Sequence, residues 1–203
     1  MGGTFSPPHI GHLHSAECFI MEMKLDKLII IPAKVSPFKI HSDATASDTD
    51  RMEMTKLCFS NLDSKNCSVE ISDIEISKNK TSYTIETIKF LKSIYPNADL
   101  YMYVGSDMFL SLERWHCFDE IFKSCHIYTR CREQNIKASI QQVKEKYENL
   151  YGARVTLSKD KEIVVSSTDV RNALESKNEQ SYRNLLTENV LRYIINRQLY
   201  NQE

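Results

Sequence analysis

Short runs of β-branched and aromatic residues alternate along this chain with longer segments whose apolar residues recur at helical spacing. The clearest strand pattern is residues 27–33, KLIIIPA, and helical patterns flank it at residues 13–25 and 49–62. Strands that are separated by helices of about a dozen residues pair in parallel, because the helix carries the chain back across the sheet. The alternation predicts an α/β fold with a doubly wound parallel sheet and helices on both faces.

The rest of the chain continues this alternation. We expect strands at residues 69–76, 99–104, 126–130, 154–157 and 162–165. We expect helices at residues 84–95, 117–124, 135–147, 168–175 and 188–197. Since no repeat or Gly- and Pro-rich linker interrupts the pattern, residues 1–203 are expected to form a single domain, with the C-terminal helices from about residue 167 packing on the sheet.

The start of the chain departs from this pattern. A Gly-rich turn normally follows a first strand in such a fold, but here only Met1 precedes the Gly-Gly pair. An empty place in the middle of a parallel sheet would expose two strand edges. We therefore expect the first strand to be missing or cut short, with the true start of the chain lying upstream.

Composition indicates which kinds of partner the chain binds and in which cell compartment we expect it. The chain has 26 Lys and Arg against 27 Asp and Glu, which argues against the clustered positive charge that nucleic-acid binding needs. No signal peptide opens the chain, and its apolar runs are far shorter than the roughly 20 residues that cross a bilayer. The six cysteines show no C-x-x-C spacing, so we expect free thiols, no zinc site and a cytoplasmic location. The sequence leaves open whether the chain forms a homo-oligomer.

The first candidate site is residues 2–12, GGTFSPPHIGH, which run into a predicted helix. Glycines such as Gly2, Gly3 and Gly11 let main-chain N–H groups approach an anion closely, and the start of a helix adds the positive end of its dipole. His9 and His12 can present ring nitrogens to a phosphate. The alternative is an ordinary capped helix start with surface imidazoles.

The second candidate site is residues 166–171, SSTDVR, which follow a β-branched run and open another helix. The hydroxyls of Ser167 and Thr168, the free N–H groups and Arg171 can bind an anion. Taken alone, the segment equally suits a capped helix with a solvated arginine. Two such sites at the carboxyl ends of parallel strands suit a polyphosphate.

The third candidate site follows the predicted strand at residues 99–104. Gly105 and Asp107 stand where a side chain can accept a hydrogen bond from a ribose hydroxyl or an amine, and Trp115 can stack on a planar ring. The alternative is a turn aspartate with a core tryptophan.

Several motifs are absent from the sequence. It contains no G-x-x-x-x-G-K-[ST], no G-x-G-x-x-G and no G-x-S-x-G, and no cysteine stands in a nucleophile-like setting. With two phosphate sites and no evident nucleophile, the favoured chemistry is direct in-line transfer onto a phosphate. Mg²⁺ is expected on the phosphates, held largely by substrate oxygens and water.

These motifs together resemble the H-x-G-H nucleotidyltransferase superfamily, and their order is similar to that of the bacterial nicotinate-nucleotide adenylyltransferases. The matching segments are GGTFSPPHIGH, SPFK at residues 36–39, DRMEM at 50–54, TSYTIET at 81–87, the Gly105 to Trp115 segment and VSSTDVR at 165–171. Ser6 stands where the family has Asp, and Phe38 stands where it has His.

The resemblance implies a Rossmann-like fold and a reaction in NAD biosynthesis, in which ATP and nicotinate mononucleotide give nicotinate adenine dinucleotide and pyrophosphate. The catalytic residues it implies are His9, His12 and Arg171. The ATP-binding residues it implies are Gly2, Gly3, Thr4, Phe5, Gly11, Gly105, Asp107, Ser167 and Thr168. The mononucleotide-binding residues it implies are Lys39, Tyr83, Thr84, Trp115 and Arg130.

Other interpretations of these motifs remain open. Phosphopantetheine adenylyltransferases share the fold but carry T-x-G-H, so His9 counts against them. Class I aminoacyl-tRNA synthetases contain H-I-G-H but need a lysine-rich second motif and a tRNA-binding body. A non-catalytic nucleotide-binding module would bind ATP without releasing pyrophosphate.

Overall fold

The computed structural model describes residues 1–34, 46–62, 66–78, 82–130, 137–160, 163–176 and 179–200. The chain divides into two compact units. Unit 1 comprises Met1 and Ser82–Glu162, and unit 2 comprises Gly2–Thr81 and Ile163–Glu203. Each unit contains a three-stranded sheet in which all strands are parallel.

The sheet of unit 2 begins with the Gly-Gly pair. Its strands are β1 (Gly2–Gly3), β2 (Lys27–Pro32) and β3 (Ser68–Ile71), hydrogen-bonded in that order. Gly2 lies opposite Ile31 and Gly3 lies opposite Pro32. The sequence predicted the first strand to be missing or cut short. The strand is not missing, but it has only two residues.

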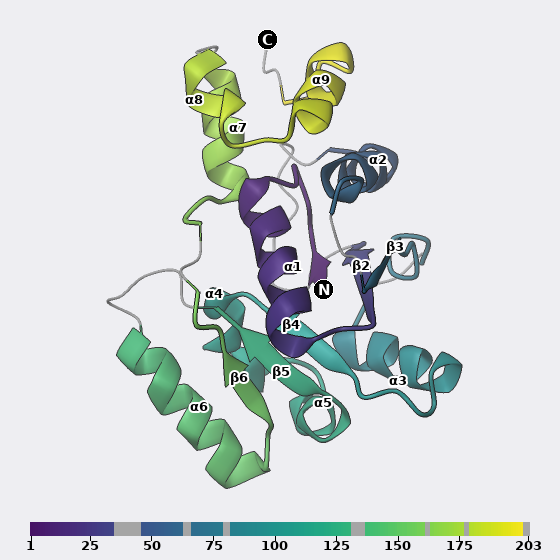
Figure 1. Ribbon diagram of the computed structural model, residues 1–203, viewed down its shortest axis with the longest axis vertical. Helices are drawn as coiled ribbons and strands as arrows, with labels where there is room; N and C mark the ends of the chain where they lie inside the picture. Colours follow the sequence, from purple (N-terminus) through teal and green to yellow (C-terminus); the bar gives the residue numbers. More distant parts are fainter. Residues whose placement is uncertain are drawn as a thin grey trace. The chain divides into compact units, whose positions relative to one another are not determined.

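The helices of unit 2 come from both ends of the chain (Figure 1). They are α1 (Ile10–Met23), α2 (Asp48–Phe59), α7 (Ser167–Glu175), α8 (Glu179–Arg183) and α9 (Glu188–Asn196). Helix α2 packs against β2, α1 and α9, and α7 packs against α8. The C-terminal helices are thus joined to the N-terminal segment within one unit.

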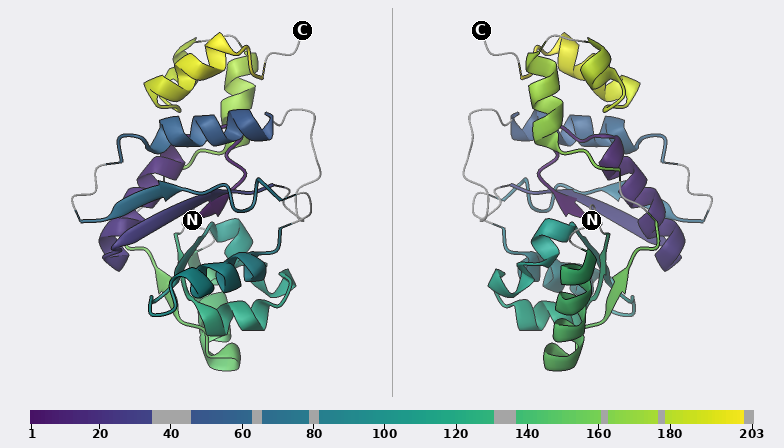
Figure 2. Two further views of the ribbon diagram at one scale, coloured as in Figure 1. Left: turned by 90° about the vertical axis from the view of Figure 1, so that its right-hand side faces the viewer. Right: turned by 90° about the vertical axis from the view of Figure 1, so that its left-hand side faces the viewer.

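Unit 1 has its own layers. Its strands are β4 (Tyr101–Val104), β5 (His126–Thr129) and β6 (Val155–Leu157). Its helices are α3 (Thr84–Ile94), α4 (Ser106–Phe109), the 3-10 helix η1 (Leu112–Arg114), α5 (Phe118–Ser124) and α6 (Lys137–Tyr151). Figures 1 and 2 show α6 on one side of this sheet and α3 with α5 on the other. Parallel strands with helices on both faces confirm the predicted α/β class, whereas the single domain stays a prediction.

Two predicted strands differ from the structure. Residues 163–165 are not a strand, because the Val165 N–H bonds back to the Ile163 carbonyl at 3.0 Å and the chain turns there. The strand expected at residues 69–76 ends at Ile71, and a turn follows in which the Ser77 N–H donates to the Asp73 carbonyl. Apolar residues continue through both turns, alternating with polar ones after Ile71 and consecutive at residues 163–165, so the pattern alone did not show the turns.

The cysteines of the described residues are free thiols, as predicted, and Cys131 lies outside those residues. Cys18, Cys58, Cys67 and Cys125 are buried, and burial raises the pKa of Cys58 and of Cys125 to about 12. Such thiols pack as small apolar side chains. Among the described helices, none combines the length and the apolar content that a membrane span requires.

Candidate active site

The loop after β1 takes a tight path that its residues enforce. Phe5 is buried and has φ +51°, in the left-handed region that bulky side chains rarely adopt. Its ring packs edge-on against Phe59 and His12. A Cβ on Gly3 would lie 2.9 Å from the ring of Phe5, so only glycine leaves room for it. A left-handed aromatic residue costs about 1–3 kcal/mol, and such strain clusters at functional sites.

The two histidines lie at the start of α1. His9 is the N-cap residue and is buried, while His12 on the first turn is partly exposed. Their rings are 3.7 Å apart between centroids. The His9 main-chain N–H donates to Nδ1 of His12 at 3.2 Å, so Nδ1 is an acceptor. Neutral His12 therefore carries its proton on Nε2, which makes Nε2 a hydrogen-bond donor.

Helix α7 begins with the predicted cap. The Asp169 N–H donates to the Ser166 hydroxyl at 3.1 Å, and the Ser166 N–H donates to Asp169 Oδ2 at 2.8 Å. This capping box uses both side chains, so the Asp169 carboxylate is held at the helix start. The N–H groups of Ser167 and Thr168 have no acceptor among the described residues. They remain donors at the positive end of the helix dipole.

The loop that leads into α1 is bonded to the start of α7, at a junction made by two hydrogen bonds. The Ser167 hydroxyl donates to the Pro7 carbonyl at 2.9 Å, and Arg171 Nη1 donates to the Ser6 carbonyl at 2.7 Å. A Cβ on Gly11 would lie 2.8 Å from Cγ1 of Val165, so the absence of a side chain permits this approach. The two segments that the sequence predicted as anion sites are therefore in direct contact, and anion binding by them stays a prediction.

Arg171 spans this junction. Besides the Ser6 carbonyl, its guanidinium bonds to the Thr168 hydroxyl at 3.0 Å through Nη2. A guanidinium has five N–H donors, so further donors remain for an anion.

The glycines of this region have a packing role. Gly3 leaves room for Phe5, and Gly11 leaves room for Val165. Phosphate binding by these glycines stays a prediction.

Arg51, which sequence reasoning did not assign to the site, ties the loop to the sheet. It is 1% exposed and donates from Nη1 to the carbonyls of Thr4 at 2.8 Å and Ala33 at 2.7 Å. Its Nη2 bonds Asp48 at 2.6 Å. Burial raises the pKa of Asp48, but hydrogen bonds from Lys34 and Arg51 outweigh it, so this pKa is lowered. Arg51 lies in the DRMEM segment, but that motif did not indicate this role.

Asp50 beside Arg51 anchors the C-terminal helix. It is buried and accepts from the Ser47 hydroxyl at 2.5 Å and from the Tyr193 hydroxyl at 2.9 Å. Arg197 lies 3.3 Å from the same carboxylate. The hydrogen bond from Ser47 and then that from Tyr193 keep the pKa of Asp50 below its ordinary value. The carboxylate is therefore occupied within the protein.

Unit 1 carries the remaining predicted nucleotide-binding residues. Gly105 is the N-cap residue of α4, and Asp107 lies exposed in that helix. A Cβ on Gly105 would be 2.9 Å from Oδ1 of Asp107, so the carboxylate lies against the main chain of the glycine. Glycine at this position leaves space for the aspartate side chain.

Aromatic residues of unit 1 gather near the start of α3. Tyr83 is its N-cap residue and is 37% exposed, and Thr84 is its first residue. The ring of Tyr83 lies 4.7 Å from that of His116 between centroids. His116 follows Trp115, which packs against the hydrophobic core of this unit while staying partly exposed. The histidine, which the motifs did not indicate, brings Tyr83 close to the segment of Trp115.

Two further residues predicted to bind the mononucleotide are Arg130 and Lys39. Arg130 follows β5 and is 0% exposed. Lys39, like Phe38, lies outside the described residues. Binding of the mononucleotide by Lys39 and Arg130 stays a prediction.

Comparison with known proteins shows the family and the fold of the chain. The cytidylyltransferase-like family model matches residues 1–173. A solved structure titled as Plasmodium falciparum nicotinic acid mononucleotide adenylyltransferase complexed with NaAD has TM-score 0.78 and 18% identity, covering 98% of this chain and 94% of that one. It shows the same fold. The chain is thus a nucleotidyltransferase with a Rossmann-like α/β fold.

Proteins of similar sequence identify the family within the nucleotidyltransferases. The "Probable nicotinate-nucleotide adenylyltransferase" of Thermoanaerobacter sp. (strain X514) is 36% identical over 100% of this chain and 93% of its own length. The protein of the same name from Carboxydothermus hydrogenoformans is 31% identical over 98% of this chain and 95% of its own length. The chain belongs to the nicotinate-nucleotide adenylyltransferase family.

Proposed function

We propose that this chain transfers the adenylyl group of ATP to nicotinate mononucleotide. The 5′-phosphate oxygen of the mononucleotide attacks the α-phosphorus of ATP, and the bond from that phosphorus to the oxygen bridging to the β-phosphate breaks. The products are nicotinate adenine dinucleotide and pyrophosphate. The observation that carries this proposal is the junction of the α1 and α7 starts, supported by the names of the relatives.

The junction suits a triphosphate. The N–H groups of Ser167 and Thr168 and the remaining donors of Arg171 lie on the first turns of α7, where the helix dipole presents its positive end. We assign the β- and γ-phosphates to these three residues. Because the donors are held in place before substrate binds, charge that develops on the leaving pyrophosphate meets an already oriented site.

His12 suits the transferring phosphoryl group. Since Nδ1 accepts from His9, the Nε2–H of His12 is a donor with a fixed direction. We assign it to an oxygen of the α-phosphate, where negative charge grows as the fifth bond forms. His9 orients this imidazole by its main-chain N–H and by ring contact. Such a donor stabilises the transition state more than the bound substrate.

The residues at the junction fit a magnesium ion that is held by the substrate. The nearby carboxylates of Asp50 and Asp169 are occupied by hydrogen bonds within the protein, and Mg²⁺ needs few protein ligands when phosphate oxygens and water supply the others. When bound, the ion neutralises charge on the phosphates. The chain itself contributes the N–H, hydroxyl and guanidinium donors.

Unit 1 supplies the groups we assign to the two ring systems. Gly105 and Asp107 contact the adenosine moiety, and Tyr83, Thr84 and Trp115 receive the nicotinate ring, with Trp115 stacking on it. Helix starts such as that of α3 offer N–H groups to the ring's carboxylate. We place the reaction in the cytoplasm, where free thiols such as those of the described cysteines persist.

The proposal is tested by pyrophosphate release from ATP and Mg²⁺ with three acceptors in parallel. We expect release with nicotinate mononucleotide and much less with nicotinamide mononucleotide or phosphopantetheine. Release with phosphopantetheine alone would move the chain to another adenylyltransferase group. A folded protein that binds ATP and releases no pyrophosphate with any acceptor would be a binding module.

A further inference from the structure

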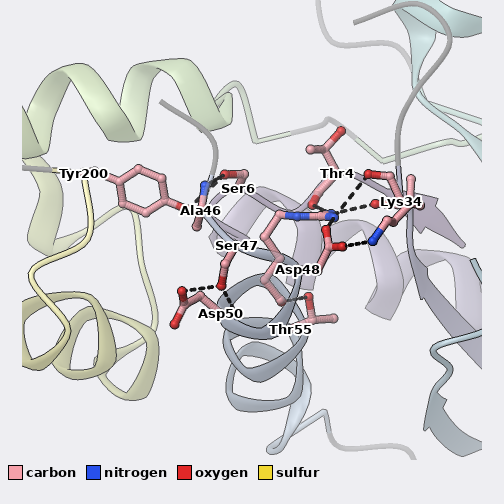
Figure 3. Close-up of polar contacts among 11 residues, drawn as sticks. Thr4, Ser6, Lys34, Ala46, Ser47, Asp48, Asp50, Thr55 and Tyr200 are labelled. Carbon is pink, nitrogen blue, oxygen red and sulfur yellow. Dashed lines mark hydrogen bonds and ion pairs between the residues drawn. The ribbon is translucent and has the colours of Figure 1, made fainter. Parts of the chain in front are cut away.

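Ser6 lies at the centre of a three-segment contact that the proposed function does not use. Its side chain is buried, with the residue 2% exposed. The Ser6 hydroxyl accepts from the Ala46 N–H at 3.1 Å and lies 3.0 Å from the Tyr200 hydroxyl (Figure 3). Because both neighbours belong to the protein, this side chain is oriented inward rather than toward a ligand.

The main chain at the same residue bears directly on the phosphate site. The Ser6 carbonyl is the acceptor for Arg171 Nη1 at 2.7 Å, and the next carbonyl, that of Pro7, accepts from Ser167 at 2.9 Å. The orientation of Ser6 therefore sets the position of an acceptor that Arg171 needs. A small rotation of this residue would move the guanidinium, and donors that are misplaced by a fraction of an ångström lose much of their effect.

The Tyr200 end of the contact is itself well anchored. Helix α9 is held to Asp50 by Tyr193 and Arg197, and the Leu199 N–H bonds back to the Ile194 carbonyl at 3.1 Å. Tyr200 then has φ +63°, so the chain turns sharply at this residue. Burial raises the pKa of Tyr200 to about 12, so its hydroxyl keeps its proton at neutral pH and can share a hydrogen bond with Ser6.

We propose that Tyr200 is a positioning residue of the phosphate site, which through the Ser6 hydroxyl holds the carbonyl that orients Arg171. The inference rests on the proposed function, since it concerns the same site. It makes the C-terminal segment after α9 a part of that site, and it gives Ser6 a role that does not require a carboxylate.

Tyr200→Phe tests the inference, and Tyr193→Phe is its matched control. Both changes delete one hydroxyl from the same C-terminal segment, but Tyr193 bonds to Asp50 and not to the loop. We expect Tyr200→Phe to weaken binding of inorganic pyrophosphate about 3- to 10-fold, the size of one hydrogen bond, and to raise the KM for ATP but not for the mononucleotide. Tyr193→Phe should lower only the free energy of unfolding.

The Ser6→Ala variant and the double variant Ser6→Ala with Tyr200→Phe show whether the two hydroxyls act together or independently. If the hydroxyls act as a pair, Ser6→Ala with Tyr200→Phe weakens pyrophosphate binding no more than the stronger single change. Pyrophosphate binding by Tyr200→Phe equal to that of Tyr193→Phe would overturn the inference. If the wild-type protein binds pyrophosphate but catalyses no adenylyl transfer, the proposed function is wrong and the inference about Tyr200 stands. If the wild-type protein binds no pyrophosphate, both are overturned.

Discussion

The predicted phosphate residues of unit 2 and the predicted ring-binding residues of unit 1 are held in different ways. In unit 2, side chains from α2 and α7 donate to main-chain carbonyls of one loop, from Thr4 to Pro7. In unit 1, the residues lie on separate elements, from the exposed Tyr83 to the fully buried Arg130. The phosphate site is a cross-linked loop, whereas the ring residues are placed by the packing of their own helices and strands.

This difference has a physical reason. Phosphate binding needs several donors aimed at one point, and such an arrangement is stable only when other hydrogen bonds fix the loop that carries them. Ring binding relies on contact area and stacking, which tolerate a wider range of geometry. Changes in unit 2 should therefore act on rate and loop geometry, and changes in unit 1 should act on affinity for one substrate.

The largest effect is expected from His12→Ala. It removes the Nε2–H donor, so kcat should fall about 100-fold or more while ATP binding largely survives. His14→Ala, on the same helix, is the control and should keep its kcat. Steady-state kinetics combined with ATP titration measure both quantities. An equal loss of ATP affinity and rate would show that His12 binds the ground state as strongly as the transition state.

Gly11→Ala is the next test of the cross-linked loop. The new Cβ would meet Cγ1 of Val165 at 2.8 Å and the ring of His9 at 3.1 Å, so these side chains must shift. We expect the free energy of unfolding to fall by about 1–3 kcal/mol, as for other overpacked sites, and the activity to fall with it. Denaturant unfolding gives the first quantity and pyrophosphate release the second.

Val165→Ala should partly rescue Gly11→Ala, because it removes the nearest atom that the new methyl meets and leaves the ring of His9 at 3.1 Å. Gly2→Ala is a control for stability alone, since its Cβ would be 3.8 Å from the Ile31 carbonyl, an ordinary contact. If Val165→Ala does not relieve Gly11→Ala, the contact between these two residues is not what requires glycine.

Trp115→Ala tests the ring residues of unit 1. Loss of stacking should raise the KM for the mononucleotide about 2- to 13-fold, equivalent to 0.5–1.5 kcal/mol, with little change in the KM for ATP. The variant should also be less stable, because Trp115 packs against the core. Trp115→Phe keeps an aromatic ring and should retain part of the affinity. An effect on the KM for ATP alone would place the nicotinate ring elsewhere.

The smallest effect is expected on the stability of the folded protein at acid pH, which depends on the carboxylate of Asp50. Its pKa in the folded protein is lowered, chiefly by the hydrogen bond from Ser47, below the ordinary value of 3.8. Protons therefore bind more readily to the unfolded chain. The stabilisation is present above pH 3.8 and is lost as the pH falls through the lower folded value. Asp50→Asn should show a shallower loss of stability in this acid range; an unchanged acid profile would contradict the role of this carboxylate.

Much of unit 2 was predictable from local patterns. The strand at Lys27–Pro32 follows from its β-branched residues, and the capped start of α7 follows from the hydroxyl residues that open it; both were found. The contact of Ser6 with Tyr200 joins residues 194 apart in the sequence, so no local pattern could indicate it. The same holds for Arg51, whose acceptors are main-chain carbonyls that carry no sequence signal.

The glycines show a further limit of sequence reasoning. Their motif predicted close approach of the main chain to phosphate, and the structure shows that Gly3 and Gly11 make room for Phe5 and Val165. Both roles require a missing side chain, so the motif alone could not distinguish them. The turn at Val165 was likewise hidden, because Ile163 and Val164 are apolar yet exposed.

We propose that the loop leading into α1 and the start of α7 together hold the triphosphate. A crystal structure with a non-hydrolysable ATP analogue and Mg²⁺ tests this proposal. We expect β- and γ-phosphate oxygens within hydrogen-bond distance of the Ser167 and Thr168 N–H groups and of Arg171, with His12 Nε2 at the α-phosphate. A triphosphate bound away from these groups would contradict it.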